Sequence, residues 1–259
     1  MNFQSNHSSE QQFTAADRKL YASLATAKGR RESGLFMAQG TKCVLDTLGH
    51  FTLRALLATS EWAESHRHIA DISVVRQRDI ERITTLTAPP EVIAVYRIPG
   101  VCAPDTSGLV LALDCVQDPG NLGTIMRLAD WMGVRTILAS EGTADCYSPK
   151  VVQATMGAIS RVRVQYCNLP DMLRDRAKVY GTFLDGDNIY TSQLSTDGIV
   201  VMGNEGRGIS PEVAALVTHR LRIPSYPPGA PTSESLNVAV ATALTLSEFR
   251  RRMLGNDLH

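Results

Sequence analysis

Asn121 and Arg127 are the first candidates for a functional site, because an amide and a guanidinium both bind hydroxyl and phosphate oxygens. They lie in residues 113–133, LDCVQDPGNLGTIMRLADWMG. The Asp-Pro-Gly-Asn sequence predicts a turn, and we expect Asn121 to cap the helix that follows. Six residues separate the two side chains, so they do not share a helix face. Spacing alone leaves an ordinary turn and helix with an exposed arginine as the alternative.

A glycine-rich segment, residues 200–210 (VVMGNEGRGIS), follows another apolar run. Three glycines within six residues allow the backbone to approach a ligand closely. The glycine order is G-x-x-G-x-G, which differs from the dinucleotide fingerprint, and no phosphate-loop Gly-Lys-Ser/Thr follows. A glycine-rich turn with an exposed Glu205 is the alternative.

The third segment, residues 222–249, is a proline-rich loop that leads into a helix rich in small residues. We expect Ser233 or Ser235 to cap this helix, which would explain either serine without catalysis. A buried helix after a surface loop is the alternative here.

Together the three segments resemble the SpoU/TrmH group of SPOUT-class RNA ribose 2′-O-methyltransferases. Motif one of that group, N-x-G-x-x-x-R after a D-P-x turn, matches Asn121, Gly123 and Arg127. Motif two, G-x-E-x-x-G, matches Gly203, Glu205 and Gly208. Motif three, I-P followed by S-L-N-V, matches Ile223-Pro224 and Ser235-Leu236-Asn237-Val238. The likeness covers about residues 109–253 in the same order.

The resemblance implies an α/β catalytic domain with a parallel sheet, a trefoil knot in its C-terminal part, bound S-adenosylmethionine and a homodimer. The catalytic region it implies contains Asn121, Arg127, Glu205, Ser235 and Asn237. The cofactor-binding residues it implies are Met202, Gly203, Gly208, Ile223 and Leu236. The arginine has been regarded as a base in this family. Because a guanidinium keeps its charge in proteins, we expect Arg127 instead to hold a phosphate and stabilise the developing alkoxide.

The expected activity is therefore S-adenosylmethionine-dependent 2′-O-methylation of RNA, with ribosomal RNA as the first expected substrate and transfer RNA as the second. An inactive RNA-binding relative is the alternative, although binding alone would not need all five catalytic positions. Base methylation is a further alternative, which motif order disfavours. A nucleotide-binding oxidoreductase is excluded because neither glycine turn has the required order or its acidic partner.

The apolar runs predict how the chain is divided. We expect a loose tail at 1–12, a small α/β domain at 13–97, a linker at 98–108 and the methyltransferase domain at 109–259. The small domain should contain helices at 15–27, 40–48, 60–68 and 77–85 and strands at 53–58, 72–75 and 92–96. The larger domain should contain strands at 109–113, 134–139, 162–166, 179–184, 198–202 and 221–223, helices capped by Ser148 and Ser210, and a final helix at 235–252. Strands of this kind between helices indicate a largely parallel sheet that is covered on both faces.

Charge is balanced overall, with 26 Lys and Arg against 26 Asp and Glu, so the chain is not a globally basic nucleic-acid protein. Within it lies a basic cluster that we expect to contact the RNA backbone: Arg18, Lys19, Lys28, Arg30 and Arg31. A solvated helix face is the alternative. Residues 18–48 also resemble the family's N-terminal substrate-binding domain, which is ribosomal-protein-like. Gln39 stands where that domain commonly has a glutamate.

Five scattered cysteines without a CxxC pair indicate reduced thiols in the cytoplasm and no zinc site. The sequence has no run of about 18 apolar residues and no signal-peptide pattern, so we expect neither a membrane span nor export. We expect no metal.

Overall fold

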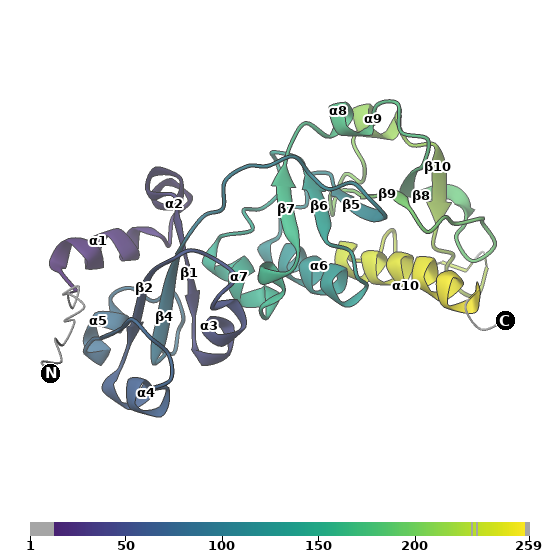
Figure 1. Cartoon of the computed structure of the whole chain (residues 1–259). Coiled ribbons are helices and arrows are strands. Elements are labelled where there is room, and N and C mark those ends of the chain that lie inside the picture. Colours follow the sequence, from purple (N-terminus) through teal and green to yellow (C-terminus); the bar gives the residue numbers. More distant parts are fainter. Residues whose placement is uncertain (1–12, 229, 232, 257–259) are drawn as a thin grey trace, which may run out of the picture. The chain divides into compact units, whose positions relative to one another are not determined.

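A computed structural model describes residues 13–228, 230–231 and 233–256, so the tail expected at 1–12 lies outside the described residues. The chain forms two compact units (Figure 1). The first contains the described residues up to Pro99 together with Tyr147–Gly157, and the second contains Gly100–Cys146 and the chain from Ala158 onward. The change of unit after Pro99 lies within the expected linker. The expected domain bounds divide the chain only once, so they do not include the return of residues 147–157 to the first unit.

The first unit is built on a four-stranded sheet in the order β1-β4-β2-β3. Its strands are β1 (Leu35–Gln39), β2 (Leu53–Ala58), β3 (Ile72–Val74) and β4 (Val92–Arg97). Strand β4 runs antiparallel to β1 and β2, and β3 runs parallel to β2. The helices are α1 (Ala15–Ser23), α2 (Ala27–Ser33), α3 (Thr41–Thr47), α4 (Ser60–Ser65), α5 (Gln77–Glu81) and α7 (Pro149–Thr155).

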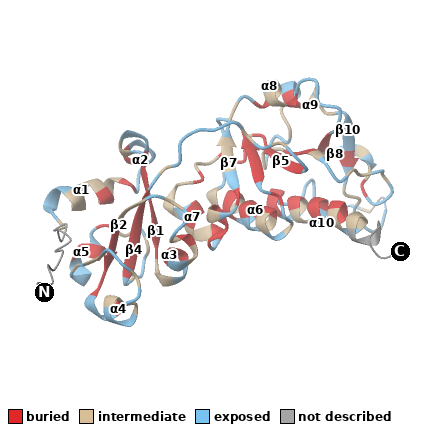
Figure 2. Ribbon diagram, viewed as in Figure 1, coloured by how far each residue is buried: buried red, intermediate tan, exposed pale blue. Residues whose placement is uncertain are grey.

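Side chains alternate between the two faces of this sheet. Met37 joins a core cluster with Tyr21 of α1 and Ile80 of α5. The neighbouring Phe36 points to the other face, where its ring lies 4.8 Å from that of Tyr147, just before α7. Both faces are therefore covered, which is why β1 and β4 are largely buried in Figure 2, as is the second half of β2.

Two expectations for this unit were wrong. The helix expected over 15–27 is two helices, because α1 stops at Ser23 and Thr26 starts α2 as its N-cap. Strand β1 was not expected at all; it follows Gly34, which ends α2 in a left-handed conformation with φ of 65°. Gln39 at the end of β1 is 2% exposed and its amide bonds Thr84 and Thr85, so in this chain it holds a loop.

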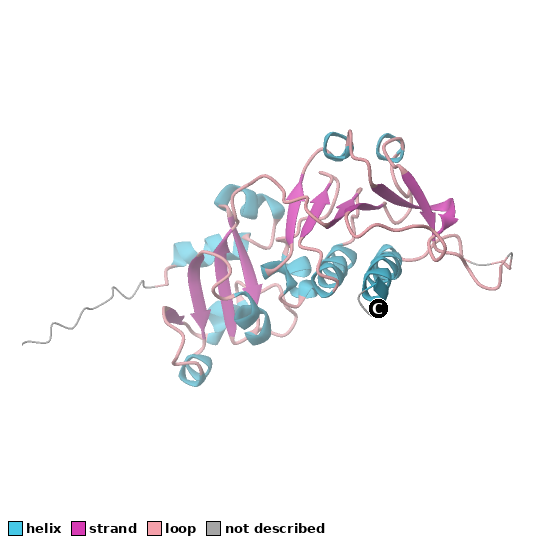
Figure 3. Cartoon of the chain, turned by 45° about the vertical axis from the view of Figure 1, so that its right-hand side comes forward, coloured by secondary structure: helices cyan, strands magenta, loops and turns pink. Residues whose placement is uncertain are grey.

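The second unit contains a six-stranded, wholly parallel sheet in the order β10-β8-β9-β5-β6-β7. The strands are β5 (Leu109–Leu113), β6 (Thr136–Ala139), β7 (Arg163–Tyr166), β8 (Val179–Asn188), β9 (Gly198–Met202) and β10 (His219–Arg222). The helices are α6 (Pro119–Trp131), the 3-10 turn η1 (Ala158–Ser160), α8 (Leu169–Leu173), α9 (Pro211–Ala214) and α10 (Val238–Asn256). The expected parallel sheet with covered faces is confirmed: α6 and α10 lie on one face and α8 and α9 on the other (Figures 1 and 3).

The starts of the helices differ from the predicted caps. The Asp118 side chain, not that of Asn121, caps α6 by accepting from the Asn121 backbone N–H at 2.8 Å. Ser148 and Ser210 precede α7 and α9 as expected, but neither side chain makes a capping hydrogen bond. The Asn237 side chain, rather than Ser233 or Ser235, accepts from the Ala239 and Val240 N–H groups at the start of α10. These differences leave the Asn121 side chain available for other contacts.

Arginines near the end of α10 hold the helix in place. Arg250 donates to the Met132 carbonyl at 2.6 Å, where α6 ends. Arg251 and Arg252 both pair with Glu248, whose side chain is 4% exposed. Hydrogen bonds from Arg251 outweigh burial and lower the pKa of Glu248 to about 2. The three arginines therefore do more than complement the helix dipole.

Candidate active site

The three motif segments leave the sheet at the carboxyl ends of parallel strands. Strands β5 and β9 are neighbours, with Leu113 opposite Met202 in the ladder. The motif-one loop (residues 114–121) and the motif-two loop (residues 203–210) therefore start side by side. The motif-three segment (residues 223–237) follows β10 on the same edge. This edge is where ligands bind in open parallel sheets.

One hydrogen-bonded network joins the three segments through side chains. Asn121 Nδ2 donates to Glu205 Oε1 at 3.0 Å, which links motif one to motif two. Asn237 Nδ2 donates to Asn121 Oδ1 at 3.0 Å, which brings in motif three. Asn121 thus uses both ends of its amide. Three of the five residues predicted for the catalytic region lie together here although up to 116 positions separate them.

The Glu205 carboxylate also faces the backbone of the motif-one loop. The N–H groups of Gln117 and Asp118 donate to its two oxygens, each at 3.4 Å. Burial alone would raise the pKa of Glu205, but the hydrogen bonds from Asn121 and from the backbone outweigh it and lower the pKa. Glu205 is thereby held as a carboxylate and is a weaker base than a free glutamate.

Arg127 and Ser235, the other two predicted catalytic residues, do not join this network. Arg127 is exposed on α6 and Ser235 is exposed in the motif-three segment. Within the described part of the chain, neither side chain has a hydrogen bond or an ion pair. Arg127 therefore presents a positive charge to solvent one turn beyond Gly123, which is buried.

The residues predicted for the cofactor lie around the same loops. Met202 ends β9 and is 1% exposed. A Cβ at Gly203 would lie 2.2 Å from the Gly208 carbonyl carbon, so only glycine lets this loop fold back on itself. Gly208 has a φ of 69°, a conformation that also favours glycine. Ile223 is half-buried directly after β10, and Leu236 is exposed beside Asn237.

Two anchoring residues of this site were not predicted from the sequence. Asp114, 4% exposed, accepts from the Ser210 N–H at 2.7 Å. Asn204 donates to the Cys115 carbonyl at 2.7 Å. Asn204 stands between the predicted Gly203 and Glu205, and Asp114 directly follows the apolar run of β5. A polar residue at that position was the available signal for each.

The basic cluster is divided between packing and solvent. Arg30 is 4% exposed and donates to the Leu24 carbonyl at 2.8 Å, so its inclusion in an RNA-contacting surface is corrected. Arg18 is half-buried and pairs with Asp79 at 3.2 Å. Lys19, Lys28 and Arg31 remain exposed, and Lys28 lies 3.8 Å from Glu32. Only part of the predicted cationic surface is therefore available to a ligand.

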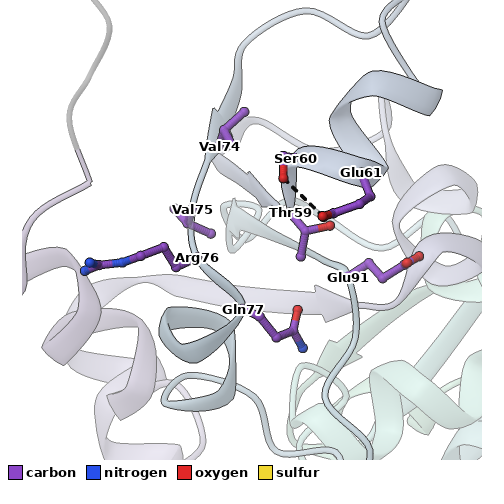
Figure 4. A pocket seen from close by; sticks show the side chains of 8 residues that line it. All are labelled: Thr59, Ser60, Glu61, Val74, Val75, Arg76, Gln77 and Glu91. Carbon is purple, nitrogen blue, oxygen red and sulfur yellow. Dashed lines mark hydrogen bonds between the residues drawn. The ribbon is translucent and has the colours of Figure 1, made fainter.

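A cavity of about 600 Å³ lies in the first unit, apart from the motif segments (Figure 4). Three segments of the chain line it: the start of α4 (Thr59, Ser60, Glu61), the end of β3 with the start of α5 (Val74, Val75, Arg76, Gln77), and Glu91 before β4. Its two carboxylates outnumber its single cation. This lining does not suit an RNA phosphate.

Over the described ranges, we find no group of three or more His, Cys, Asp or Glu side chains arranged to hold a metal ion. Within the same residues, no helix is long and apolar enough to cross a membrane. Among the described residues, no disulfide joins any of the five cysteines.

Comparison with known proteins assigns the family. Residues 108–247 match the SpoU rRNA Methylase family, so this chain belongs to that family. The chain is 33% identical over 173 residues to the 23S rRNA (guanosine(2553)-2′-O)-methyltransferase RlmP of Bacillus subtilis, covering 65% of this chain and 68% of that protein.

Solved structures agree over nearly the whole chain. A putative RNA methyltransferase of the TrmH family from Porphyromonas gingivalis has a TM-score of 0.85 and 43% identity, covering 93% of this chain and 99% of that one. An AdoMet-bound rRNA methyltransferase from Sinorhizobium meliloti has a TM-score of 0.80 and 30% identity, covering 93% and 97%. The α/β fold with its parallel sheet is thus that of SPOUT methyltransferases.

Proposed function

We propose that this protein is an S-adenosylmethionine-dependent RNA 2′-O-ribose methyltransferase that acts on ribosomal RNA. The observation that carries the proposal is the Asn237–Asn121–Glu205 network, which gathers the polar residues of three motifs at one sheet edge. Family membership and the rRNA methyltransferases among the relatives support the same function.

The residues present fit the cofactor. S-adenosylmethionine, when bound, supplies an electrophilic methyl group on a sulfonium. The tightly folded loop between Gly203 and Gly208 offers backbone polar groups, while Ile223 and Leu236 offer apolar surface; Met202 is buried beneath the start of this loop. This mixture suits a ligand with a polar amino-acid part and a largely apolar adenine face.

The protein's part in the reaction is to position the RNA and stabilise charge. The exposed guanidinium of Arg127 holds a phosphate next to the target ribose and stabilises the alkoxide that develops at the 2′-oxygen. Glu205, which is kept ionised, fixes Asn121 and the motif-one loop rather than taking the proton. Water or a neighbouring phosphate accepts the proton lost from the 2′-hydroxyl. Ser235, which is exposed in the motif-three segment, is the remaining residue of the proposed catalytic region.

We also propose that the protein works as a homodimer and that the chain around α10 forms the family's trefoil knot. Trp131 on α6 is 86% exposed, and Val240 and Leu244 on α10 are 49% and 38% exposed. Large exposed apolar side chains on neighbouring helices favour a protein interface. Light scattering of Trp131→Glu tests this, since a dimeric wild type should become monomeric.

The first unit, in this proposal, is a ribosomal-protein-like RNA-binding domain whose contacts come from the basic cluster residues that remain exposed. The cytoplasm is its proposed location, in keeping with five scattered cysteines that include no CxxC pair. Transfer RNA is the second candidate substrate, and an inactive RNA-binding protein is the alternative function.

The test is transfer of labelled methyl from S-adenosylmethionine to total RNA from cells that lack this gene. Label in one RNA, released by alkali as a resistant dinucleotide, supports ribose methylation and identifies the substrate class. A label that does not protect against alkali indicates base methylation. Labelling only of ribosomal assembly intermediates keeps the function and changes the substrate form. Absence of cofactor binding supports the inactive RNA-binding protein.

A further inference from the structure

We propose that Asn204 is a positioning residue, which orients the Glu205 carboxylate by fastening the motif-two loop to the motif-one loop. The inference rests on the function proposed above, because Glu205 belongs to the catalytic region of that reaction. Asn204 itself has no assigned role in the motif pattern G-x-E-x-x-G, which leaves its position unspecified.

The Asn204 amide uses both of its ends. Nδ2 donates to the Cys115 carbonyl at 2.7 Å, and Oδ1 accepts from the Gly206 and Arg207 N–H groups at 2.9 and 3.0 Å. A carbonyl can only accept and a backbone N–H can only donate, so these partners fix the orientation of the amide. One side chain thereby connects the two loops and holds the turn that follows it.

The backbone closes the same turn. Asn204 and Gly208 exchange two hydrogen bonds of 2.9 Å each, which makes residues 204–208 a closed loop. Glu205 is the first residue inside this loop, and its Oε2 lies 3.4 Å from Asn204 Nδ2. Fixing Asn204 therefore limits the positions that the Glu205 carboxylate can take, and it keeps Oε1 within reach of Asn121.

An asparagine meets these requirements and close substitutes do not. Aspartate keeps the two acceptor contacts but points a negative charge at the Cys115 carbonyl and at Glu205. Alanine leaves that half-buried carbonyl without its donor. The other charged residues near Glu205 in these loops are Asp118, whose side chain is engaged with the Asn121 N–H, and Arg207 on the turn itself.

Asp114 provides an internal comparison. It fastens the far end of the same loop through the Ser210 N–H but makes no contact with Glu205 in the described structure. A variant that only loosens the loop, Asp114→Asn, should therefore affect stability more than the ionisation of Glu205.

The experiment measures methyl transfer by the full chain at saturating RNA and S-adenosylmethionine. Asn204→Asp should lower kcat at least tenfold, leave the Kd for S-adenosylmethionine within twofold, and shift the acidic limb of the pH–rate profile to higher pH. In a Glu205→Gln background the same change should add less than a twofold loss. Asn168→Asp, the same substitution at the cap of α8, is the matched control and should change none of these values.

Unchanged kcat in Asn204→Asp, or a full tenfold loss that persists in the Glu205→Gln background, overturns the inference. A wild type that transfers no methyl group overturns the proposed function instead. In that case NMR titration of ¹³C-labelled glutamate still decides the inference: the pKa of Glu205 must rise in Asn204→Asp and not in Asn168→Asp or Asp114→Asn. An unmoved Glu205 pKa contradicts it.

Discussion

In the second unit three loops combine their polar side chains in one network, whereas in helices α1 and α2 of the first unit the cations are divided between packing and solvent. Asn121, Glu205 and Asn237 bond one another across the carboxyl edge of the sheet. Arg30, in contrast, turns inward to the Leu24 carbonyl, and Lys19 faces water. Polar side chains that come together from separate strand ends indicate a functional site. Cations that are merely close in sequence along a helix do not.

The strongest test of this contrast is Arg127, a cation of the second unit that the fold does not use. We expect Arg127→Ala to lower the methyl-transfer rate about 10²–10³-fold, because charge on the developing alkoxide loses its partner. The Kd for S-adenosylmethionine should stay near the wild-type value, and calorimetry measures it. A loss of cofactor affinity as large as the loss of rate contradicts the role given to Arg127.

Arg30 tests the other side of the comparison. Arg30→Ala should lower the free energy of unfolding by about 2–3 kcal/mol, since it leaves a buried carbonyl without a donor and creates a cavity. Urea denaturation measures this, with Arg31→Ala as the control that should change stability little. Equal stability of the two variants would mean that Arg30 belongs with the exposed cations after all.

Glu248 extends the contrast to Arg251 and Arg252, which the second unit uses in ion pairs within its own fold. Its pKa in the folded chain is lowered to about 2 from 4.5, so its contribution to stability is present above about pH 4.5 and is lost as the pH falls toward 2. Glu248→Gln should cost about 2 kcal/mol at pH 7 and weaken the pH dependence of unfolding over that window. Thermal unfolding from pH 7 to pH 2 checks both effects, with the exposed Glu212→Gln as control.

The smallest expected effect belongs to the exposed cations. Charge reversal at Lys19 and Arg31 should weaken RNA binding severalfold at low salt and reduce the salt dependence of the affinity, without changing the melting temperature. Filter binding over a range of salt concentrations measures it. Unchanged affinity favours a solvated helix face.

The sequence predicted the second unit better than the first, for reasons that particular residues make clear. Strands β5 and β9 have the expected ends because each is an apolar run bounded by a glycine before it and a polar residue or glycine after it. Strand β1 was missed because Leu35, Met37 and Gln39 are good helix formers and the run lacks the β-branched residues that β5 and β9 contain.

Side-chain roles were harder to predict than elements. Asp118 and Asn121 are both good caps, and which of them caps α6 depends on Glu205, 84 positions from Asn121. The burial of Arg30 likewise depends on how α2 packs after Thr26 starts it. Long-range contacts of this kind leave no local pattern, so only motif resemblance brought the distant members of the site together.

The return of Tyr147–Gly157 to the first unit means that this unit is built from two separate stretches of the chain. Helix α7, with Val151 and Val152 buried, reaches β1 only after the chain has built part of the second sheet. Cutting the linker near residues 100–107 would therefore produce two fragments that share one core, since the C-terminal fragment still carries a wall of the N-terminal one. The N-terminal fragment would lack α7, and the C-terminal fragment would carry α7 without the sheet it packs on. We therefore expect neither fragment to fold into a complete unit when it is expressed by itself.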